Sequence, residues 1–297
     1  MTPQQPGSAS QGSDAAHRLH SPLVRRISAS VVIPNFNGVG FLSETLASIA
    51  AQHAAALDVI IVDGGSTDGS VEIIRSWAEA NGARWVSEPD GGQAQAINKG
   101  FRMASGDIVT WLNSDDLLPP GAVARAIEEF EHDPELDFTW GFCLLIDADG
   151  RPIRIGNFHV RRDLAELRGS RNFVVQPGTW FRRSVFDRFG YLDESYHFVF
   201  DYEFFLRMAG NVKARFVPEV VSNFRIHSSS KTGSQHGKFL PEEWRAFRSH
   251  GGSINSPFVL DILRNRLMMP AVSRVTRPLR YILWRALGLE PGTKVRV

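Results

Sequence analysis

The sequence predicts an α/β protein with a mostly parallel central sheet flanked by helices. Short apolar runs alternate with segments of helical periodicity from residue 29 to about residue 120. The runs are apolar almost throughout, as expected of parallel strands that helices cover on both faces. The chain has 297 residues, 43% of them hydrophobic, and is long enough to bury a substantial core. In such sheets, ligands bind beyond the carboxyl ends of the strands.

The expected elements follow one another in chain order. The first half has strands at 30–34, 59–63, 84–86 and 108–112 and helices at 40–52, 69–80 and 93–103. The second half has a helix at 121–132, a hairpin at 144–155, a helix at 200–209 and a strand at 220–226. The hairpin is centred on Asp149-Gly150, which is a strong two-residue turn signal.

The composition excludes several classes of protein. Lys and Arg number 33 against 32 Asp and Glu, a balance that argues against a dedicated nucleic-acid binder. The single cysteine, Cys143, excludes a disulfide framework and a multi-cysteine zinc site, and it suits a reducing compartment. No run approaches the ~18 apolar residues of a membrane span. Residues 1–28 lack the apolar region of a signal peptide, so we expect a cytoplasmic protein.

Two adjacent carboxylates, Asp115 and Asp116, follow directly after the strand expected at 108–112. Neighbouring carboxylates repel each other and are costly unless solvent or a cation neutralises them. Oxygen ligands in an open arrangement suit Mg²⁺ or Mn²⁺, typically shared with substrate phosphates. The pair can equally cap the helix that begins near Pro120, and both interpretations stay open.

Three further segments carry candidate site residues. In VDGGSTDG (62–69), Asp63 can accept hydrogen bonds from a base or ribose, although a plain strand-to-helix loop has the same composition. Asp201, at the start of an apolar helix, is either an N-terminal cap or a general base. His227 follows a strand, where a histidine is more often a surface or core residue than a ligand.

Several motifs occur in a fixed order. They are SVVIPNFN (30–37), VDGGSTDG (62–69), GGQAQAINKG (91–100), ASGD (104–107), LNSDD (112–116), QPGT (176–179), GYLDE (190–194), FDYE (200–203) and RIH (225–227). This series, from Ser30 to Thr232, resembles the family 2 glycosyltransferases of the GT-A fold. The resemblance implies inverting transfer of a sugar from a nucleotide-diphosphate sugar to an acceptor hydroxyl. The acceptor is expected to be a glycan or lipid-linked, in cell-surface polysaccharide or glycolipid synthesis.

The resemblance also implies a role for each matching residue. Asp63 holds the nucleobase or ribose, and Asp201 is the catalytic base. The metal, Mg²⁺ or Mn²⁺, is held by Asp115, Asp116 and His227. The other residues implied in nucleotide-sugar binding are Pro34, Asn35, Asn37, Gly65, Ser66, Gln93, Asn98, Lys99, Asn113 and Ser114. The metal would stabilise charge that grows on the departing diphosphate, while Asp201 takes the proton of the acceptor hydroxyl.

Two positions depart from the family's common pattern. Gly64 replaces the second of two acids after the second strand, which is expected to loosen or alter nucleoside selectivity. Asn113 replaces the first acid of the metal motif. An asparagine still offers an oxygen ligand, so metal dependence then rests mainly on Asp115 and Asp116.

Two other functions compete with sugar transfer. A nucleotide-sugar or glycan-binding protein without catalysis would lack the base, yet Asp201 is present. A sugar-nucleotide pyrophosphorylase would need a Gly-rich first loop with a basic residue, whereas this loop reads PNFNG (34–38). The sequence identifies neither the sugar, the nucleobase nor the acceptor.

Four parts are expected along the chain. They are a disordered leader (1–28), a nucleotide-sugar-binding half (29–118), an acceptor-binding and catalytic half of the same domain (119–235) and a basic helical extension (236–297). Residues 264–297 hold eight basic side chains and one acidic one, which leaves 25 basic and 31 acidic in the rest. The extension either packs on the domain or makes peripheral membrane contact through 258–297, at the inner face of the membrane.

Overall fold

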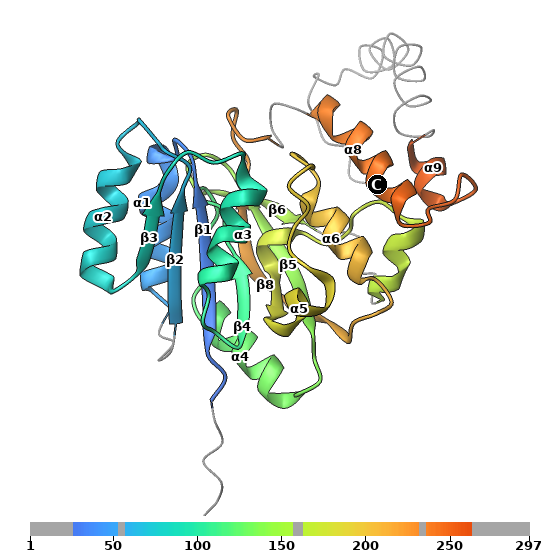
Figure 1. The fold of residues 1–297 in the computed structure, drawn as a ribbon, viewed down its shortest axis with the longest axis horizontal. Coiled ribbons are helices and arrows are strands. Elements are labelled where there is room, and N and C mark those ends of the chain that lie inside the picture. The colour runs from blue at the N-terminus through green and yellow to red at the C-terminus, as the bar shows by residue number, and fades with distance from the viewer. Residues whose placement is uncertain (1–25, 53–56, 157–162, 232–235, 263–297) are drawn as a thin grey trace, which may run out of the picture.

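One eight-stranded sheet forms the centre of the described part of the chain (Figure 1). The computed structural model describes residues 26–52, 57–156, 163–231 and 236–262. Their eight strands follow the order β3-β2-β1-β4-β7-β5-β6, and β8 pairs with β5. Most of the expected leader and the whole of the basic segment 264–297 lie outside the described residues. No helix within the described ranges has both the length and the apolar character needed to cross a membrane.

The first half confirms the predicted alternation of strands and helices. The strands are β1 (Ala29–Asn35), β2 (Leu57–Asp63), β3 (Arg84–Ser87) and β4 (Ile108–Trp111), and the helices are α1 (Val39–Ala50), α2 (Ser70–Asn81) and α3 (Gln93–Met103). Strand β1 pairs in parallel with β2 and β4, and β2 pairs in parallel with β3.

Both faces of this parallel region are buried. Ile33 of β1 lies in one apolar cluster with Leu42 and Leu46 of α1. Its neighbour Val32 lies in the other cluster, with Ile97 of α3. Successive residues of a strand face opposite sides of a sheet, so each side of β1 needs apolar residues. This explains why the strands are apolar throughout instead of alternating.

The second half adds antiparallel pairs to the sheet. Its elements are α4 (Ala122–His132), β5 (Phe138–Ile146), β6 (Pro152–Gly156), β7 (Thr179–Arg182), α5 (Ser184–Phe189), α6 (Phe200–Met208), β8 (Ala214–Arg225), α8 (His236–Ser249) and α9 (Pro257–Ile262). The predicted hairpin is confirmed as β5 and β6, and the predicted last strand begins earlier than expected. No prediction covered β7, which pairs antiparallel with both β4 and β5.

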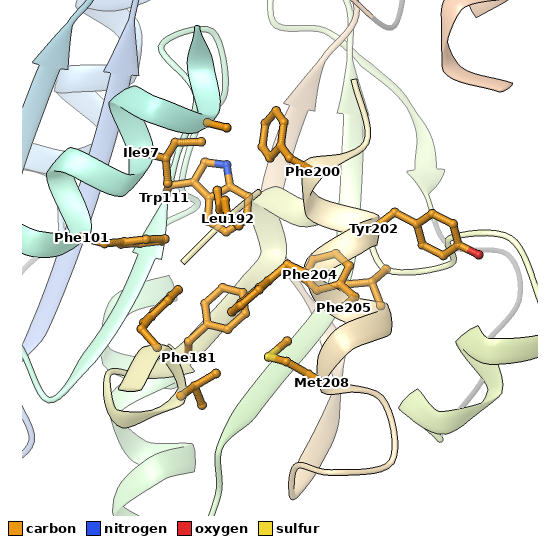
Figure 2. Close-up of a cluster of buried hydrophobic side chains, with 14 of the residues drawn as sticks. Ile97, Phe101, Trp111, Phe181, Leu192, Phe200, Tyr202, Phe204, Phe205 and Met208 are labelled. Carbon is orange, nitrogen blue, oxygen red and sulfur yellow. The ribbon is translucent and has the colours of Figure 1, made fainter. Parts of the chain in front are cut away.

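Aromatic side chains fasten α6 to the sheet (Figure 2). The ring of Phe204 stacks on Phe186 of α5 with 5.4 Å between centroids and lies 5.7 Å from the ring of Phe181 on β7. Phe205 lies 5.6 Å from Phe138 of β5. Such aromatic pairs bury a large area in a defined geometry. The helix that carries Asp201 is therefore held firmly against the central strands.

Candidate active site

Polar side chains gather where β1, β2 and β4 end. Asn35, the last residue of β1, is the register partner of Asp63, the last residue of β2. Asn113 and Ser114 follow β4, which pairs with β1 on its other side. The carboxyl ends of parallel strands meet at one edge, so the loops predicted to carry the site lie together, as the rule for open α/β sheets requires.

Asp63 is fully buried and surrounded by hydrogen-bond donors. Its carboxylate accepts from the side chains of Asn35 (2.7 Å), Ser66 (2.6 Å) and Ser87 (2.7 Å). It also accepts from the backbone N–H groups of Gly65 (3.1 Å) and Ser66 (2.9 Å). Burial acts to raise the pKa of Asp63, but hydrogen bonds led by that from Ser66 outweigh it, so the pKa lies below its ordinary value. Asp63 is thus an ionised anchor of the loop.

The loop after β1 is shaped around the same residues. Asn37 has a left-handed backbone (φ 49°), its N–H donates to Ser66 Oγ and its Oδ1 accepts from the N–H of Thr67. Pro34 is buried within β1. The Oδ1 atom of Asn35 is buried and has no hydrogen-bond partner in the described part of the chain. A buried acceptor that is left unpaired is costly. A hydrogen-bond donor of a bound ligand can pair with this oxygen.

Asp115 and His227 meet although 112 residues separate them. Asp115 Oδ2 lies 2.9 Å from His227 Nε2, and both side chains keep some exposure. On its far side the imidazole contacts Ser229 Oγ through Nδ1 at 2.8 Å, and its ring packs on Phe41 at 4.4 Å. A second contact that fixes the ring is typical of histidines that bind metals. Of the three predicted metal ligands, these are the two whose donor atoms converge.

Asp116 does not present its carboxylate in the same way. It is fully buried: Oδ1 accepts from the backbone N–H of Arg225 (2.9 Å) and Oδ2 accepts from Asn113 Nδ2 (3.0 Å). Burial, and after it the charge of Asp115, raises the pKa of Asp116 well above its ordinary value. The expectation that Asp116 is a metal ligand therefore does not fit its surroundings. Among the described residues, no three His, Cys, Asp or Glu side chains group tightly enough to hold a metal.

Arg225 supports this corner of the site and was not singled out as a functional residue from the sequence. Its side chain is fully buried, with Nε donating to the backbone oxygen of Asp115 (2.9 Å) and Nη1 to that of Ala148 (2.8 Å). Nη2 donates to Glu44 at 2.7 Å, and the guanidinium lies 4.8 Å from the ring centre of Phe41. The sequence signal that could have identified it is a charged residue at a position of the strand that faces the interior. Arg225 holds the Asp115 backbone in place.

Asp201, the predicted base, lies in the first turn of α6. Burial of its carboxyl is the main cause that raises its pKa to about 6, against backbone hydrogen bonds that lower it. The charge of Glu243 raises it further and the charge of Lys231 lowers it. A carboxyl with a pKa near neutrality is suited to proton transfer at physiological pH.

Gln93 and Lys231 link the loop after β4 with the segment that leads to α6. Gln93 donates from Nε2 to Asn113 Oδ1 (2.7 Å) and accepts from Lys231 Nζ (2.9 Å). Lys231 also donates to the backbone oxygen of His197 (2.9 Å), in the segment that leads to α6. Burial lowers the pKa of Lys231. Gln93 thus bridges Asn113 and Lys231, which comes from the loop after β8.

The side chains of two predicted nucleotide-binding residues, Asn98 and Lys99, bond to other parts of the protein. Asn98 is buried, donates to Leu192 O (2.9 Å) and Glu194 (2.9 Å), and accepts from Leu192 N–H (3.0 Å). Lys99 forms an ion pair with Glu88. These contacts give Asn98 a structural role, because the hydrogen bonds of its side-chain amide all hold the segment before α6.

Helix α8 also contacts the segment that leads to α6. None of the sequence motifs includes α8. The carboxylate of Glu242 accepts from three successive backbone N–H groups, at 3.1 Å from His197, 2.8 Å from Phe198 and 3.3 Å from Val199. Glu243, beside it, pairs with Arg171 at 2.9 Å. No sequence pattern identifies such a contact, because it depends on how α8 packs on α6.

Comparison with known proteins finds related glycosyltransferases. The chain is 33% identical over 186 residues to an uncharacterized glycosyltransferase of Mycobacterium tuberculosis, covering 61% of this chain and 68% of that protein. It is 29% identical over 201 residues to a PGL/p-HBAD biosynthesis glycosyltransferase of Mycobacterium bovis, covering 66% and 75%.

Two solved structures share the GT-A fold. TarS of S. aureus in complex with UDP-GlcNAc aligns with a TM-score of 0.62 and 18% identity, over 78% of this chain and 68% of that chain. The mannosyltransferase PcManGT of Pyrobaculum calidifontis in complex with GDP-Man and Mn²⁺ aligns with a TM-score of 0.59 and 19% identity, over 89% and 82%. The model of the family described as Glycosyl transferase family 2 matches residues 30–190, more than half of the chain. The chain belongs to this family and is a glycosyltransferase of the GT-A fold.

Proposed function

We propose that this glycosyltransferase moves a sugar from a nucleotide-diphosphate sugar to an acceptor hydroxyl in one displacement that inverts the anomeric centre. The observation that carries the proposal is a pair of corners, Asp115 with His227 at one and the near-neutral carboxyl of Asp201 at the other. Gln93 hydrogen-bonds to Asn113 and to Lys231, and the charge of Lys231 acts on Asp201. In such a displacement the acceptor hydroxyl needs a base, and the leaving diphosphate needs a counter-charge.

The donor set at the first corner fits a divalent cation shared with a diphosphate. Asp115 offers a carboxylate oxygen and His227 an imidazole nitrogen, 2.9 Å apart and partly exposed. Mg²⁺ and Mn²⁺ accept one or two protein ligands when substrate phosphates and water complete the shell. When bound, the cation would neutralise charge on the departing nucleoside diphosphate. The structural neighbour PcManGT carries GDP-Man and Mn²⁺, which is consistent with this site.

A donor screen tests the proposal. Nucleoside diphosphate release from UDP-, GDP-, CDP- and ADP-sugars would be followed with Mn²⁺ or Mg²⁺, with and without candidate acceptors. We expect release from at least one donor, loss of at least tenfold on chelation with EDTA, and a similar loss in Asp115→Asn and His227→Ala. Equal turnover with EDTA would reject the metal, and no release from any donor would reject the sugar transfer.

Proton uptake by Asp201 makes the rate depend on pH in a defined direction. The ionised form is required, and the pKa is raised to about 6. We therefore expect kcat/KM to fall tenfold per pH unit below about pH 6 and to level off above it. A profile from pH 4.5 to 9 at constant metal concentration measures this. A fall that began only near pH 4 would show that the titrating group is another carboxyl.

The acceptor is proposed to be a glycan or a lipid-linked molecule in polysaccharide or glycolipid synthesis at the inner face of the membrane. The M. bovis relative is named for PGL/p-HBAD biosynthesis, and residues 264–297 carry eight basic side chains against one acid. Each basic residue near an anionic surface contributes about 1 kcal/mol. Cosedimentation with vesicles of anionic lipid tests this contact. Unchanged binding after Arg274, Arg277 and Arg280 are replaced by Glu would exclude it.

A further inference from the structure

Gly64 follows Asp63 at the position where the family commonly has a second acid, yet the space beside it holds a carboxylate. A Cβ atom built on Gly64 would lie 2.9 Å from Oδ2 and 3.2 Å from Cγ of Asp90. Asp90 belongs to the loop between β3 and α3, so its carboxylate arrives from a different segment. The acid that is missing after β2 is replaced in space by one from the next loop.

The loop that carries Asp90 is fixed against the end of β2. The N–H of Glu88 donates to the backbone oxygen of Asp63 at 3.1 Å. A Cβ on Gly65 would lie 3.2 Å from the backbone nitrogen of Pro89, so these two backbones are also in close approach. Asp90 Oδ1 accepts from the N–H of Gly92 at 2.8 Å. The carboxylate is therefore held in one orientation, over Gly64.

The two acids of this corner differ in what they offer a ligand. Both oxygens of Asp63 are engaged, since five hydrogen bonds from the surrounding loops end on them. Asp90 has one oxygen engaged, and its Oδ2 makes no hydrogen bond to any described residue. A ligand group that bound Asp63 would have to displace protein donors, whereas Asp90 Oδ2 is available.

We propose that Asp90, and not Asp63, supplies the carboxylate that selects the nucleobase of the sugar donor, and that it favours bases with a ring N–H. This rests on the proposed function. An ionised carboxylate only accepts hydrogen bonds. Uracil offers its N3–H and guanine offers N1–H together with its amino group. Cytosine and adenine offer only an exocyclic amino group, beside a ring nitrogen that carries no hydrogen and repels a carboxylate.

Calorimetric binding of UDP, GDP, CDP and ADP in the presence of Mn²⁺ tests this assignment on the full chain. The wild type should bind UDP or GDP more tightly than CDP and ADP. Asp90→Ala should weaken the preferred diphosphate about 10- to 100-fold, the usual effect of losing a hydrogen bond to a charged group, and should leave the others nearly unchanged. Asp90→Asn should narrow or reverse the preference for UDP over CDP, because an amide can donate to the ring nitrogen of cytosine.

Two further variants separate recognition from loop structure. Glu88→Gln changes an exposed acid two residues away and should bind like the wild type. The exchange Gly64→Asp with Asp90→Gly returns the carboxylate to the end of β2 and should recover part of the lost selectivity. Equal loss of all four diphosphates in Asp90→Ala, or an unchanged preference in Asp90→Asn, would overturn the role of Asp90 while leaving the proposed function intact. Binding of no diphosphate by the wild type would reject both.

Discussion

Replacing Asp201 with Asn is expected to lower kcat by about 10²- to 10⁴-fold, the usual contribution of a general base. The amide of asparagine keeps the size of the side chain but cannot take a proton from the acceptor hydroxyl. The proposed site for the donor diphosphate is the other corner, where Asp115 contacts His227, so the Kd for the nucleoside diphosphate should change little. The measurement is steady-state transfer with calorimetry on the same preparations.

The stability of this variant distinguishes lost chemistry from lost structure. The pKa of Asp201 in the folded protein is about 6, above the ordinary 3.8, so the folded state binds the proton more tightly than the unfolded state. The group's stabilising contribution is thus complete below about pH 4 and is lost as pH rises toward 6. At pH 8 Asp201→Asn should be at least as stable as the wild type. Asp187→Asn, on the exposed surface of α5, serves as control. Wild-type transfer by Asp201→Asn would remove Asp201 from the mechanism.

Replacing Arg225 with Met is expected to lower the free energy of unfolding by about 3–5 kcal/mol, the range found when one partner of a buried charged network is removed. The backbone oxygens of Asp115 and Ala148 would lose their donors, and the stacking on Phe41 would be lost. Buried Asp116 would lose a favourable charge nearby. Denaturant unfolding followed by circular dichroism measures the change.

The exposed end of the same network provides the control. Glu44 is 57% exposed, so Glu44→Gln should change the free energy of unfolding by less than about 1 kcal/mol. Arg225→Lys keeps the charge but lacks the planar fork that reaches several oxygens, and should fall between the two. Arg225→Met should also weaken Mn²⁺ binding, because the Asp115 backbone is released. If Arg225→Met were as stable as Glu44→Gln, the supporting role of Arg225 would be wrong.

The sequence predicts the first half of the fold well because each strand there is buried on both faces. That environment requires continuous apolar runs, and the runs at Val31–Ile33 and Ile60–Val62 are buried as expected. Strand β7 was not predicted because its four residues, TWFR, show no hydrophobic periodicity. They form a strand only by pairing with β4 and β5. Helix α8 acts on the site through Glu242, which is a matter of packing alone.

Some of the candidate site residues could likewise be predicted from the sequence, whereas others depend on contacts made only in the folded protein. The resemblance to the family places Asp115, His227 and Asp201 in functional positions, and the structure brings Asp115 and His227 together. The resemblance does not distinguish which of the two adjacent carboxylates, Asp115 or Asp116, points outward. In the structure the carboxylate of Asp116 is turned into the protein. The loss of an acid at Gly64 is visible in the sequence. Its replacement by Asp90 depends on a contact between two loops and is not.

The configuration of the transferred sugar is the most direct test of a single displacement assisted by Asp201. The donor and acceptor found in the screen would react with the wild type, and the anomeric proton of the product would be followed by NMR from the first minutes. Single displacement predicts a product of the opposite anomeric configuration to that of the donor. A product that keeps the donor's configuration would contradict it, since retention requires a second displacement or a different path.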